Sequence, residues 1–438
     1  MNYIMPKTLP GFMELNPYDQ IQFNKMKKII SDTYESYGFW PLDTPVIEYS
    51  DVLLAKAGGE TEKQIYRFNK GDNDLSLRFD LTVPLAKYVA QRYNDLPFPF
   101  KRYQIGKVYR GERPQKGRFR EFYQCDIDVI GDETLSLQYD VEMPSIIYDI
   151  FKKMNIGDFV IKINNRKILN GFFSSLQLKD SYVEILRIID KIDKIGEIET
   201  RNCLNDVIND EKKLDSIMDF IRITGTNEEK ILKLKEFNIT NDNFTNGICE
   251  LEYVIDSMKK MGVASENYEI DLTIARGLDY YTGTVYETFL KDHPNIGSIC
   301  SGGRYDNLAE YYTEKRLPGV GISIGLTRLF YQLKEANIIK STDNSCADIM
   351  ILPMDENCYS YVYNINSILR NNGFKTSVCF TNNKLKSKIR YADKCHVKYV
   401  IIIGEDEIQN NSITIKNMET GQQEMSKLND IFNIVKNN

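Results

Sequence analysis

Residues Val108–Gly131 read VYRGERPQKGRFREFYQCDIDVIG, and this stretch decides the fold. Its flanks predict two antiparallel strands, Lys101–Arg110 and Phe119–Ile130, because apolar residues nearly alternate along the second one. The connection between them carries four cations: Arg113, Lys116, Arg118 and Arg120. Since like charges repel, this loop is either a solvated hairpin tip or a binding site for an anion such as phosphate. The rest of the chain has to decide between these readings.

Length and composition restrict the class of protein. At 438 residues the chain is too long for one hydrophobic core, so we expect two or three domains. No apolar run is long enough to cross a bilayer, which predicts a globular protein without membrane contact. The net charge of −6 excludes a general coat for nucleic acid, so any nucleic-acid contact must use local basic patches.

The cysteines and the first residues predict a cytoplasmic protein. No two of the eight cysteines show C-x-x-C spacing, and His293 and His396 have no ligand-like neighbours in the sequence. A structural zinc site is therefore not expected, and the thiols are most simply reduced. Residues 1–12 show no signal-peptide pattern, which agrees with a cytoplasmic location.

Changes in sequence texture divide the chain into three parts. Residues 164–263 are rich in Lys, Asp, Glu and Ile and predict a helical insertion. After a polar linker at Lys340–Ser345, strand and helix patterns alternate, which indicates a small α/β domain. We therefore expect an α+β domain built on an antiparallel sheet from residues 1–163 and 264–339, the insertion at 164–263, and an α/β domain at 345–438.

Within the α/β domain the expected order is strand, helix, strand, helix, strand. The strands are expected at 348–352, 375–379 and 399–403, with helices at 359–371 and 383–393. A hairpin follows, and a last helix is expected to start near Met425.

Four polar or glycine-rich segments could carry chemistry, and each also has a plain structural reading. Asp80 and Thr82 follow a strand and precede a helix, where they either cap that helix or face a ligand. Arg276–Gly283 and Ser301–Asp306 contain glycines that let the backbone approach a ligand or simply make turns. Gly319–Arg328 loosely matches a dinucleotide fingerprint, but the surrounding strands lack the βαβ context, so we discount that reading.

Together these segments resemble a known family. Arg110–Phe122 is similar to motif 2 of class II aminoacyl-tRNA synthetases, Leu326–Leu329 to motif 3, and Pro45 to motif 1. Arg276–Gly283 and Gly302–Asp306 resemble two segments peculiar to histidyl-tRNA synthetases. The likeness covers nearly the whole chain, and its C-terminal part resembles the family's anticodon-binding domain. It implies the class II fold and two reactions. Histidine and ATP give histidyl-adenylate and pyrophosphate, and histidine then passes to the 3′ end of tRNA(His).

The resemblance implies where ATP binds. Arg110 matches an arginine on the α-phosphate and Arg276 a second one, and both are expected to stabilise charge that develops there. The resemblance also implies Glu112 at the edge of adenine, with Phe122 and Arg328 on its two faces. Arg118 is implied at the outer phosphates. Mg²⁺ is expected to arrive with ATP, but the sequence does not name its protein ligands.

The resemblance also implies a histidine pocket. The residues expected around the α-amino group are Asp80, Thr82 and Gln124. Those expected around the imidazole are Asp128, Tyr281 and Tyr305, with Arg276 and Tyr280 from the same signature segment also at the histidine site. An acid and a phenol can satisfy both ring nitrogens, so analogues without them would be rejected by up to about 10⁴-fold. Arg113 and Gln115, in the basic loop, resemble residues that read the acceptor end of the tRNA.

Two other functions are weighed against this one. A regulatory paralogue that binds histidine and partners an ATP phosphoribosyltransferase typically lacks the phosphate arginines and the C-terminal domain. Here Arg110, Arg276 and Arg328 are all present. A class II synthetase for threonine, proline or glycine has a similar C-terminal domain, but Asp128 and Tyr281 argue against it.

Further features of the resemblance concern assembly and lineage. Motif 1 at Pro45 implies a homodimer. Thr327 stands where part of the family has an acid, and Asp80 stands where one branch has a glutamate. Both departures suggest the branch that is more like the eukaryotic enzymes, and neither argues against activity.

Overall fold

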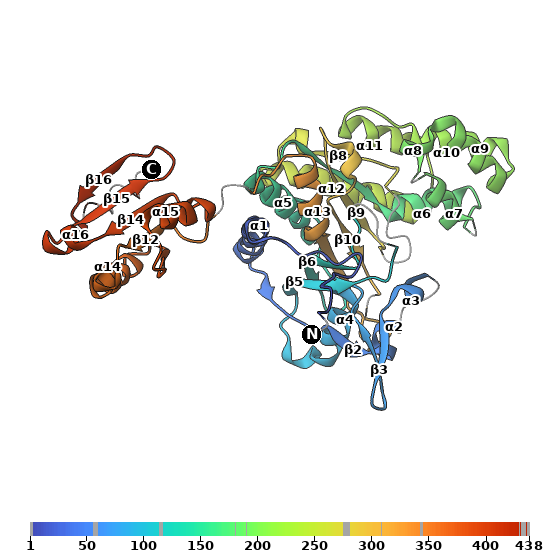
Figure 1. Cartoon of the computed structure of the whole chain (residues 1–438). Coiled ribbons are helices and arrows are strands. Elements are labelled where there is room, and N and C mark those ends of the chain that lie inside the picture. Colours follow the sequence, from blue (N-terminus) through green and yellow to red (C-terminus); the bar gives the residue numbers. More distant parts are fainter. Residues whose placement is uncertain are drawn as a thin grey trace. The chain divides into compact units, whose positions relative to one another are not determined.

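The structure of the chain is a computed structural model (Figure 1). It describes residues 3–55, 60–113, 117–179, 181–189, 191–274, 281–307, 309–341 and 345–428, with 430 and 435. Contacts divide the chain into two units. The first consists of residues 1–14 and 26–339, and the second of residues 15–25 and 340–438.

An eight-stranded sheet forms the centre of the first unit, in the order β1-β5-β6-β11-β10-β9-β7-β8. Neighbouring strands run antiparallel except for the parallel pairs β1–β5 and β7–β8. The strands are β1 (Trp40–Pro41), β5 (Phe100–Tyr109), β6 (Glu121–Ile130), β7 (Phe159–Asn165), β8 (Tyr268–Ile270), β9 (Thr284–Leu290), β10 (Cys300–Tyr305) and β11 (Gly319–Ile324). This arrangement confirms the antiparallel sheet that the sequence predicted.

The predicted hairpin lies inside this sheet as β5 and β6, which pair along all ten residues of each strand. Successive side chains of a strand point to opposite faces, so β6 has two different sides. Its apolar, fully buried side consists of Cys125, Ile127 and Val129. Its polar side consists of Gln124, Asp126 and Asp128. The functional site can therefore form on only one face of the sheet.

Helices cover the apolar face. Helix α5 (Gln138–Met154) packs against β10 and β11, and α13 (Leu326–Glu335) packs against β6 (Figure 1). On β10, Arg304 extends toward α5 and donates from Nε to Asp140 Oδ2 at 3.0 Å. The next residue, Tyr305, points to the opposite face and donates to Asp128 at 2.8 Å. The alternation along β10 thus separates the covered face from the face of the site.

The remaining elements of the first unit flank this sheet. A small sheet has the order β2-β4-β3, with β2 (Ile47–Tyr49), β3 (Arg67–Lys70) and β4 (Asn73–Leu77). The N-terminal helices are α1 (Pro17–Ser36), whose residues up to Lys25 belong to the second unit, α2 (Ser50–Leu54), α3 (Glu60–Gln64) and α4 (Thr82–Gln91). Helix α4 begins where Asp80 and Thr82 were expected to meet a helix.

Residues 164–263 are mainly helical, as expected for the insertion. The helices are α6 (Arg166–Ser175), α7 (Tyr182–Ile189), α8 (Ile192–Ile195), α9 (Glu197–Ile208), α10 (Glu211–Ile221), α11 (Asn227–Glu236) and α12 (Asp242–Lys260). Helix α12 packs closely on α6, because a Cβ on Gly171 would lie 2.5 Å from the backbone nitrogen of Phe244. The boundaries of this region as a separate domain stay a prediction.

The second unit contains a five-stranded sheet in the order β13-β12-β14-β15-β16. Its strands are β12 (Ile349–Pro353), β13 (Thr376–Val378), β14 (Tyr399–Ile403), β15 (Ile413–Asn417) and β16 (Gln423–Ser426), and its helices are α14 (Tyr359–Asn371), α15 (Leu385–Lys394) and α16 (Glu405–Gln409). Strands β12, β13 and β14 are parallel, which confirms the predicted α/β alternation.

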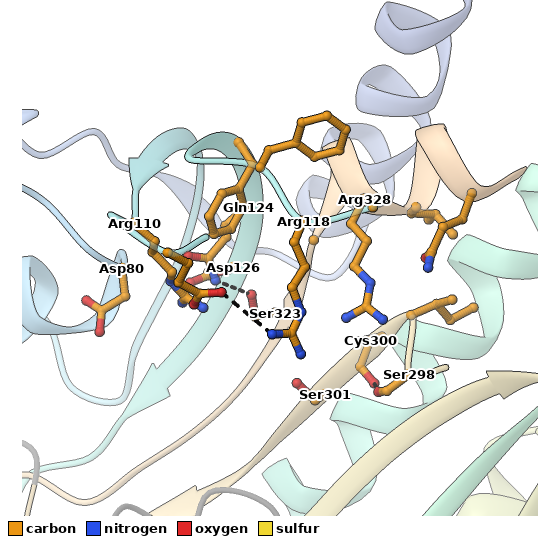
Figure 2. Close-up of a pocket in the computed structure, with 18 of the residues that line it drawn as sticks. Asp80, Arg110, Arg118, Gln124, Asp126, Ser298, Cys300, Ser301, Ser323 and Arg328 are labelled. Carbon is orange, nitrogen blue, oxygen red and sulfur yellow. Dashed lines mark hydrogen bonds and ion pairs between the residues drawn. The ribbon is translucent and has the colours of Figure 1, made fainter. Parts of the chain in front are cut away.

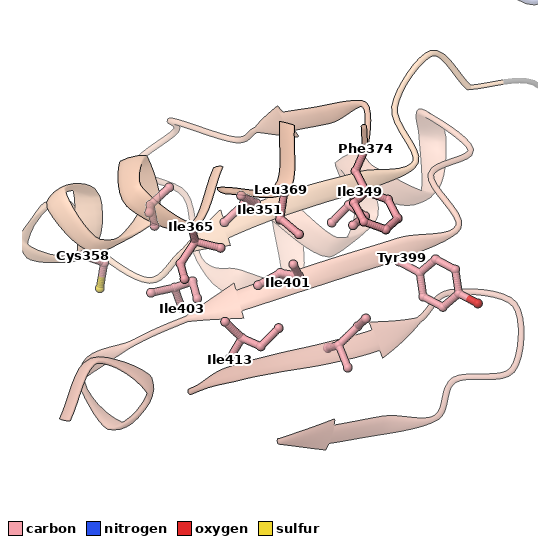
Figure 3. Close-up of a cluster of buried hydrophobic side chains, with 12 residues drawn as sticks. Ile349, Ile351, Cys358, Ile365, Leu369, Phe374, Tyr399, Ile401, Ile403 and Ile413 are labelled. Atoms are coloured by element: carbon pink, nitrogen blue, oxygen red, sulfur yellow. The ribbon is translucent and has the colours of Figure 1, made fainter. Parts of the chain in front are cut away.

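Two hydrophobic clusters hold this unit together, one on each face of the sheet. In Figure 3, Ile351 and Ile401 of the sheet meet Ile365 and Leu369 of α14. On the other face, Met350, Leu352, Val400 and Ile402 pack against Ala392 of α15. Alternating side chains of β12 and β14 therefore enter different cores, as expected for buried parallel strands.

The last helix, expected to start near Met425, begins just after β16, since the described residues Leu428, Asp430 and Val435 are helical. Met425 itself lies in β16 and pairs with Thr414 of β15 in an antiparallel ladder. The strand edge of β15 therefore extends the sheet through Met425, and the helix starts later than expected.

Other expectations concern membranes, cysteines and metals. In the part of the chain that the structure describes, no helix is both long and apolar enough to cross a membrane. All eight cysteines are free thiols. Across the same residues, no group of three or more His, Cys, Asp or Glu side chains is placed to hold a metal ion.

Candidate functional site

A cavity of about 500 Å³ opens on the polar face of the large sheet (Figure 2). It is lined by the basic hairpin, the start of α4, strands β10 and β11, and the start of α13. The lining includes these residues predicted from the sequence: Asp80, Thr82, Arg110, Glu112, Arg118, Phe122, Gln124, Tyr281 and Arg328. The tertiary fold thus brings segments that are far apart in the sequence to one place.

Arg110 lies at the inner end of the basic loop, in contact with two aromatic rings. Its guanidinium carbon is 4.3 Å from the ring centroid of Phe79 and 5.2 Å from that of Phe122. Its Nε donates to the carbonyl oxygen of Phe79 at 3.3 Å. Burial lowers the pKa of Arg110, and the carboxylate of Asp80 opposes that shift. Because arginine stays charged even so, this cation is partly dehydrated and available to an anion in the cavity.

In the outer part of the loop, one arginine fits the anion-binding reading and another fits the solvated-tip reading. Arg118 lines the cavity and is 3.8 Å from Glu112, with 60% of its side chain exposed. An exposed ion pair of this length is weak, so Arg118 can exchange Glu112 for another anion. Arg113 is exposed and does not line the cavity. The anion-binding reading therefore fits Arg118, while Arg113 is a solvated side chain of the tip.

The residues expected around adenine lie on different elements. Phe122 comes from β6 and Arg328 from α13, and both line the cavity. Arg328 donates from Nη2 to the carbonyl oxygen of Ile296 at 3.1 Å. Thr327, which departs from the family pattern, accepts a hydrogen bond from the backbone nitrogen of Tyr123 at 2.8 Å. This bond fixes the start of α13 against β6 and so positions Arg328.

Asp80 caps the start of a helix, as one of its two readings predicted, and it also lines the cavity. Its Oδ1 accepts hydrogen bonds from the backbone nitrogens of Thr82 at 3.1 Å and Val83 at 2.9 Å, at the start of α4. Burial raises the pKa of Asp80, while the bond from Val83 and the charge of Arg110 oppose this rise. One of its two oxygens is therefore already occupied as a helix cap.

Two of the residues expected at the imidazole lie behind the cavity and bind each other. Tyr305 donates its hydroxyl to Asp128 Oδ1 at 2.8 Å, and Arg102 Nη2 is 2.6 Å from Asp128 Oδ2. Neither Asp128 nor Tyr305 lines the cavity, whereas Tyr281 does. Burial raises the pKa of Asp128, and Arg102 opposes that rise. Their assigned roles at histidine stay predictions.

Arg102 was not found by the sequence reasoning, although a signal was present. It is fully buried on β5 and lies directly opposite Asp128 in the β5–β6 register. Counting back along the predicted hairpin would have paired these two residues. A buried arginine opposite a buried acid favours the charged form of that acid and so opposes the effect of burial on its pKa.

Glycines of β11 make room for Asp128 and Tyr305. A Cβ on Gly321 would lie 2.2 Å from Asp128 Oδ1, and one on Gly319 would lie 2.4 Å from the Tyr305 ring. The glycine spacing that loosely matched a dinucleotide fingerprint therefore serves close packing. It leaves space where two large polar side chains cross β11.

Asp126 and Ser323 also line the cavity, and the sequence reasoning missed both. Burial raises the pKa of Asp126 to about 7, while the charge of Arg102 opposes the rise. Gln124 donates from Nε2 to Ser323 Oγ at 2.8 Å (Figure 2). A signal for Asp126 was available, since it lies two residues from both Gln124 and Asp128 and must share their face of the strand.

Three of the predicted site residues, Gln115, Arg276 and Tyr280, lie outside the described residues. Their roles therefore stay predictions.

Comparisons with known proteins agree with this geometry. The family model for histidyl-tRNA synthetase matches residues 11–329, and a model for an anticodon-binding domain matches residues 348–438. The chain belongs to the histidyl-tRNA synthetase family. A histidine–tRNA ligase of Clostridium tetani is 57% identical over 435 residues, which cover 99% of each chain. One from Finegoldia magna is 52% identical over 99% of this chain and 100% of its own.

Solved structures support the class II fold of this family. A histidyl-tRNA synthetase from Nostoc superposes with a TM-score of 0.92 at 40% identity, over 100% of this chain and 99% of its own. A Bacillus halodurans protein described as an ATP phosphoribosyltransferase regulatory subunit/histidyl-tRNA synthetase has a TM-score of 0.76 at 18% identity. That weaker likeness, over 92% of this chain, shows the fold alone. The regulatory-paralogue reading is not favoured.

Proposed function

We propose that the chain activates L-histidine with ATP to give histidyl-adenylate and pyrophosphate, and then transfers histidine to the 3′ end of tRNA(His). One observation carries this proposal. A single cavity has arginines suited to phosphates, Arg110 and Arg118, and hydrogen-bonding groups suited to an amino acid, Gln124 and Tyr281. Activation needs both substrates held together, because proximity and charge stabilisation supply most of the rate.

In the proposed first step, the carboxylate oxygen of histidine attacks the α-phosphorus of ATP and pyrophosphate leaves. The dehydrated guanidinium of Arg110 would stabilise charge on the α-phosphate oxygens, with Arg276 as the predicted second cation. Arg118 would hold the departing phosphates. Mg²⁺ would come with ATP, since this ion binds mainly through phosphates, water and one or two carboxylates. Glu112, a carboxylate that lines the cavity beside Arg118, fits such a role.

In the proposed second step, the terminal ribose hydroxyl of the tRNA attacks the adenylate carbonyl, and AMP leaves. The exposed loop tip with Arg113 is the proposed contact for the acceptor end. The proposed contact for the anticodon is the unit at 345–438, supported by the match of residues 348–438 to an anticodon-binding domain.

We further propose that the protein works as a homodimer. The support is that three apolar side chains close to Pro45 in the sequence are exposed. They are Trp40 (60% exposed), Ile47 (47%) and Tyr49 (57%). Sedimentation velocity tests this, with Ile47→Asp expected to shift the protein toward monomer and Ile195→Asp, at an exposed site on the insertion, as the control. A monomeric parent protein at micromolar concentration would contradict the proposal.

The decisive experiment is amino-acid-dependent exchange of labelled pyrophosphate into ATP. Each of the twenty amino acids is tested separately with the purified full chain. Histidine is expected to support exchange far above the others, followed by histidine transfer to tRNA(His) but not to a tRNA for another amino acid. A histidine signal no higher than that of threonine, proline or glycine would make the proposal wrong.

A further inference from the structure

Strand β8 leaves the large sheet just before a segment that carries predicted site residues. The parallel ladder between β7 and β8 ends at the pair Ile163–Ile270, and the backbone nitrogen of Asp271 makes one further bond, to the carbonyl oxygen of Ile163 at 3.0 Å. Leu272 and Ile274 follow and are both buried. Their carbonyl oxygens therefore need donors that the ladder no longer supplies.

Asn164 supplies these donors. It follows Ile163 in β7 and is fully buried. Its side-chain nitrogen donates to the carbonyl oxygen of Leu272 at 3.2 Å and to that of Ile274 at 3.3 Å. Its side-chain oxygen accepts from the backbone nitrogen of Asn165 at 2.8 Å, which fixes the orientation of the amide. An ionised carboxylate could not take this place, because it has no donor.

The residues after Asn164 hold the other end of the same segment. Residues Asn164–Arg166 join β7 to α6, and we call them the β7–α6 junction. The backbone nitrogen of Arg166 donates to the carbonyl oxygen of Gly283 at 2.8 Å. Segment 271–283 thus leaves the sheet beside Asn164 and returns beside Arg166. One short stretch of chain therefore fixes both ends of the segment.

The β7–α6 junction is itself held from two sides. Its first two residues pair with Val285 and Thr284 of β9 in the antiparallel ladder. The side chain of Asn165 caps α6 by accepting from the backbone nitrogen of Lys167 at 2.9 Å, and it donates to Glu250 of α12 at 2.9 Å. The sheet on one side and the helical insertion on the other therefore leave the junction little freedom to move.

The segment matters because of the residues it carries. Tyr281 lines the cavity, and Arg276, the predicted second cation, follows Ile274 by two residues in the sequence. We propose that Asn164 is a positioning residue for histidine activation, because it sets the path of the chain toward Arg276 and Tyr281. This inference rests on the proposed function. Misplacing a catalytic group by about 1 Å can lower a rate by about 10²-fold, so a residue behind the cavity can control the chemistry.

The test is a series of donors at position 164. Asn164→Ser keeps one donor, and Asn164→Ala keeps none. Histidine-dependent pyrophosphate exchange is measured with the full chain at saturating histidine and ATP, at a temperature at which circular dichroism shows each variant to be folded. We expect kcat to fall by about 10-fold in Asn164→Ser and by about 100-fold or more in Asn164→Ala. A kcat of Asn164→Ala equal to that of the parent would overturn the proposal. If that variant does not fold, a parent-like kcat of Asn164→Ser would overturn it.

The matched control is Asn267, at the other end of the same pair of strands. It is 3% exposed, and its side-chain nitrogen donates to the carbonyl oxygen of Phe159, the first residue of β7, at 2.7 Å. Asn267→Ala also takes a buried amide away from a backbone carbonyl, so it should lose stability but keep the parent kcat for exchange. If Asn164→Ala and Asn267→Ala lose exchange in equal measure, Asn164 serves only the fold and the proposal is overturned.

A cycle of single and double substitutions shows whether Asn164 acts through the segment. Residues that act together give losses that do not multiply. Asn164→Ala should therefore slow adenylate formation much less in an Arg276→Ala background than in the parent. Losses that multiply in full would overturn the proposal.

Pyrophosphate exchange by the parent protein separates this proposal from the proposed function. No histidine-dependent exchange in the parent would refute the function itself. Exchange in the parent, together with an unchanged kcat in Asn164→Ala, would refute only the role of Asn164.

Discussion

Single residues in this protein act through charges that the fold holds out of water. Arg110 contacts the rings of Phe79 and Phe122, and Asp128 is held by Arg102. Such groups interact strongly because little solvent screens them, and each is costly to leave unpaired. Substitutions at this scale should therefore change activity and pH dependence more than they change the fold.

Arg110→Ala should lower the rate of histidine-dependent pyrophosphate exchange by about 10²- to 10³-fold, the usual cost of removing one group that stabilises transition-state charge. The affinity for histidinol should change little, because the guanidinium is assigned to phosphate. Arg92→Ala removes an exposed arginine paired with Asp95 at 3.6 Å and is the control. A loss of less than tenfold in the exchange rate of Arg110→Ala would remove Arg110 from its assigned role.

Arg276→Ala should also reduce adenylate formation by orders of magnitude while leaving histidine binding largely intact. Single-turnover formation of histidyl-adenylate measures this directly. An unchanged rate would show that the matching of Arg276 to the second phosphate arginine is wrong.

Asp126→Asn should stabilise the ligand-free protein at high pH. The pKa of Asp126 is raised to about 7, so the folded protein binds more protons than the unfolded chain between about pH 4 and 7. Stability from this carboxyl is therefore lost as the pH rises through that window. Removing the charge should raise the free energy of unfolding by about 2–4 kcal/mol at pH 8 and by much less at pH 5. Urea unfolding at both pH values measures this, and an equal effect at both would contradict it.

At the scale of elements, strand β11 both contributes buried apolar side chains to the core and leaves space for neighbouring polar side chains. Its even-numbered residues, such as Ile322, are buried, while Gly319 and Gly321 leave space for Tyr305 and Asp128. The strand therefore works as a spacer as well as a member of the sheet. The β5–β6 hairpin has a similar double role, with an apolar face for α13 and a polar face for the cavity.

Gly321→Ala should displace the Asp128 carboxylate, since the new Cβ would lie 2.2 Å from Oδ1 and 2.4 Å from the carbonyl oxygen of Ile127. We expect a loss of about 1–3 kcal/mol in stability from overpacking and a raised KM for histidine. Ile322→Val, which removes a methyl group from the other face, should cost about 1 kcal/mol with no change in KM. The KM for histidine and the unfolding midpoint distinguish these outcomes. Equal KM values in both variants would mean that Gly321 serves only packing.

At the scale of the whole molecule, the two units have separate hydrophobic cores. The sheet of the second unit is enclosed by its own clusters around Ile351 and Leu352. This separation agrees with two tasks: chemistry in the first unit and tRNA recognition in the second.

A chain that ends at Ile339 should therefore keep histidine-dependent pyrophosphate exchange but lose most of its tRNA charging. We expect kcat/KM for tRNA(His) to fall by about 100-fold or more, which corresponds to roughly 3 kcal/mol of lost binding. Circular dichroism and the exchange assay check that the shortened chain is folded. If charging survives in full, the C-terminal unit does not contribute to recognition of the tRNA.

The sequence by itself determined the antiparallel hairpin, the α/β alternation after Ser345 and the family. These depend on local periodicity and on motifs such as Arg110–Phe122, which are visible before folding. It also identified many of the residues that line the cavity. It placed the start of the last helix slightly too early, because Met425 pairs with the edge of β15 and the helical residues follow from Leu428.

Only the tertiary structure decided which polar groups are buried and with whom they pair. The bond of Arg102 to Asp128, the helix cap made by Asp80 and the bond of Asn164 to Leu272 all depend on the tertiary fold. Burial and neighbouring charge set the protonation and hydrogen-bonding needs of a carboxylate, and neither is a property of its own position in the sequence.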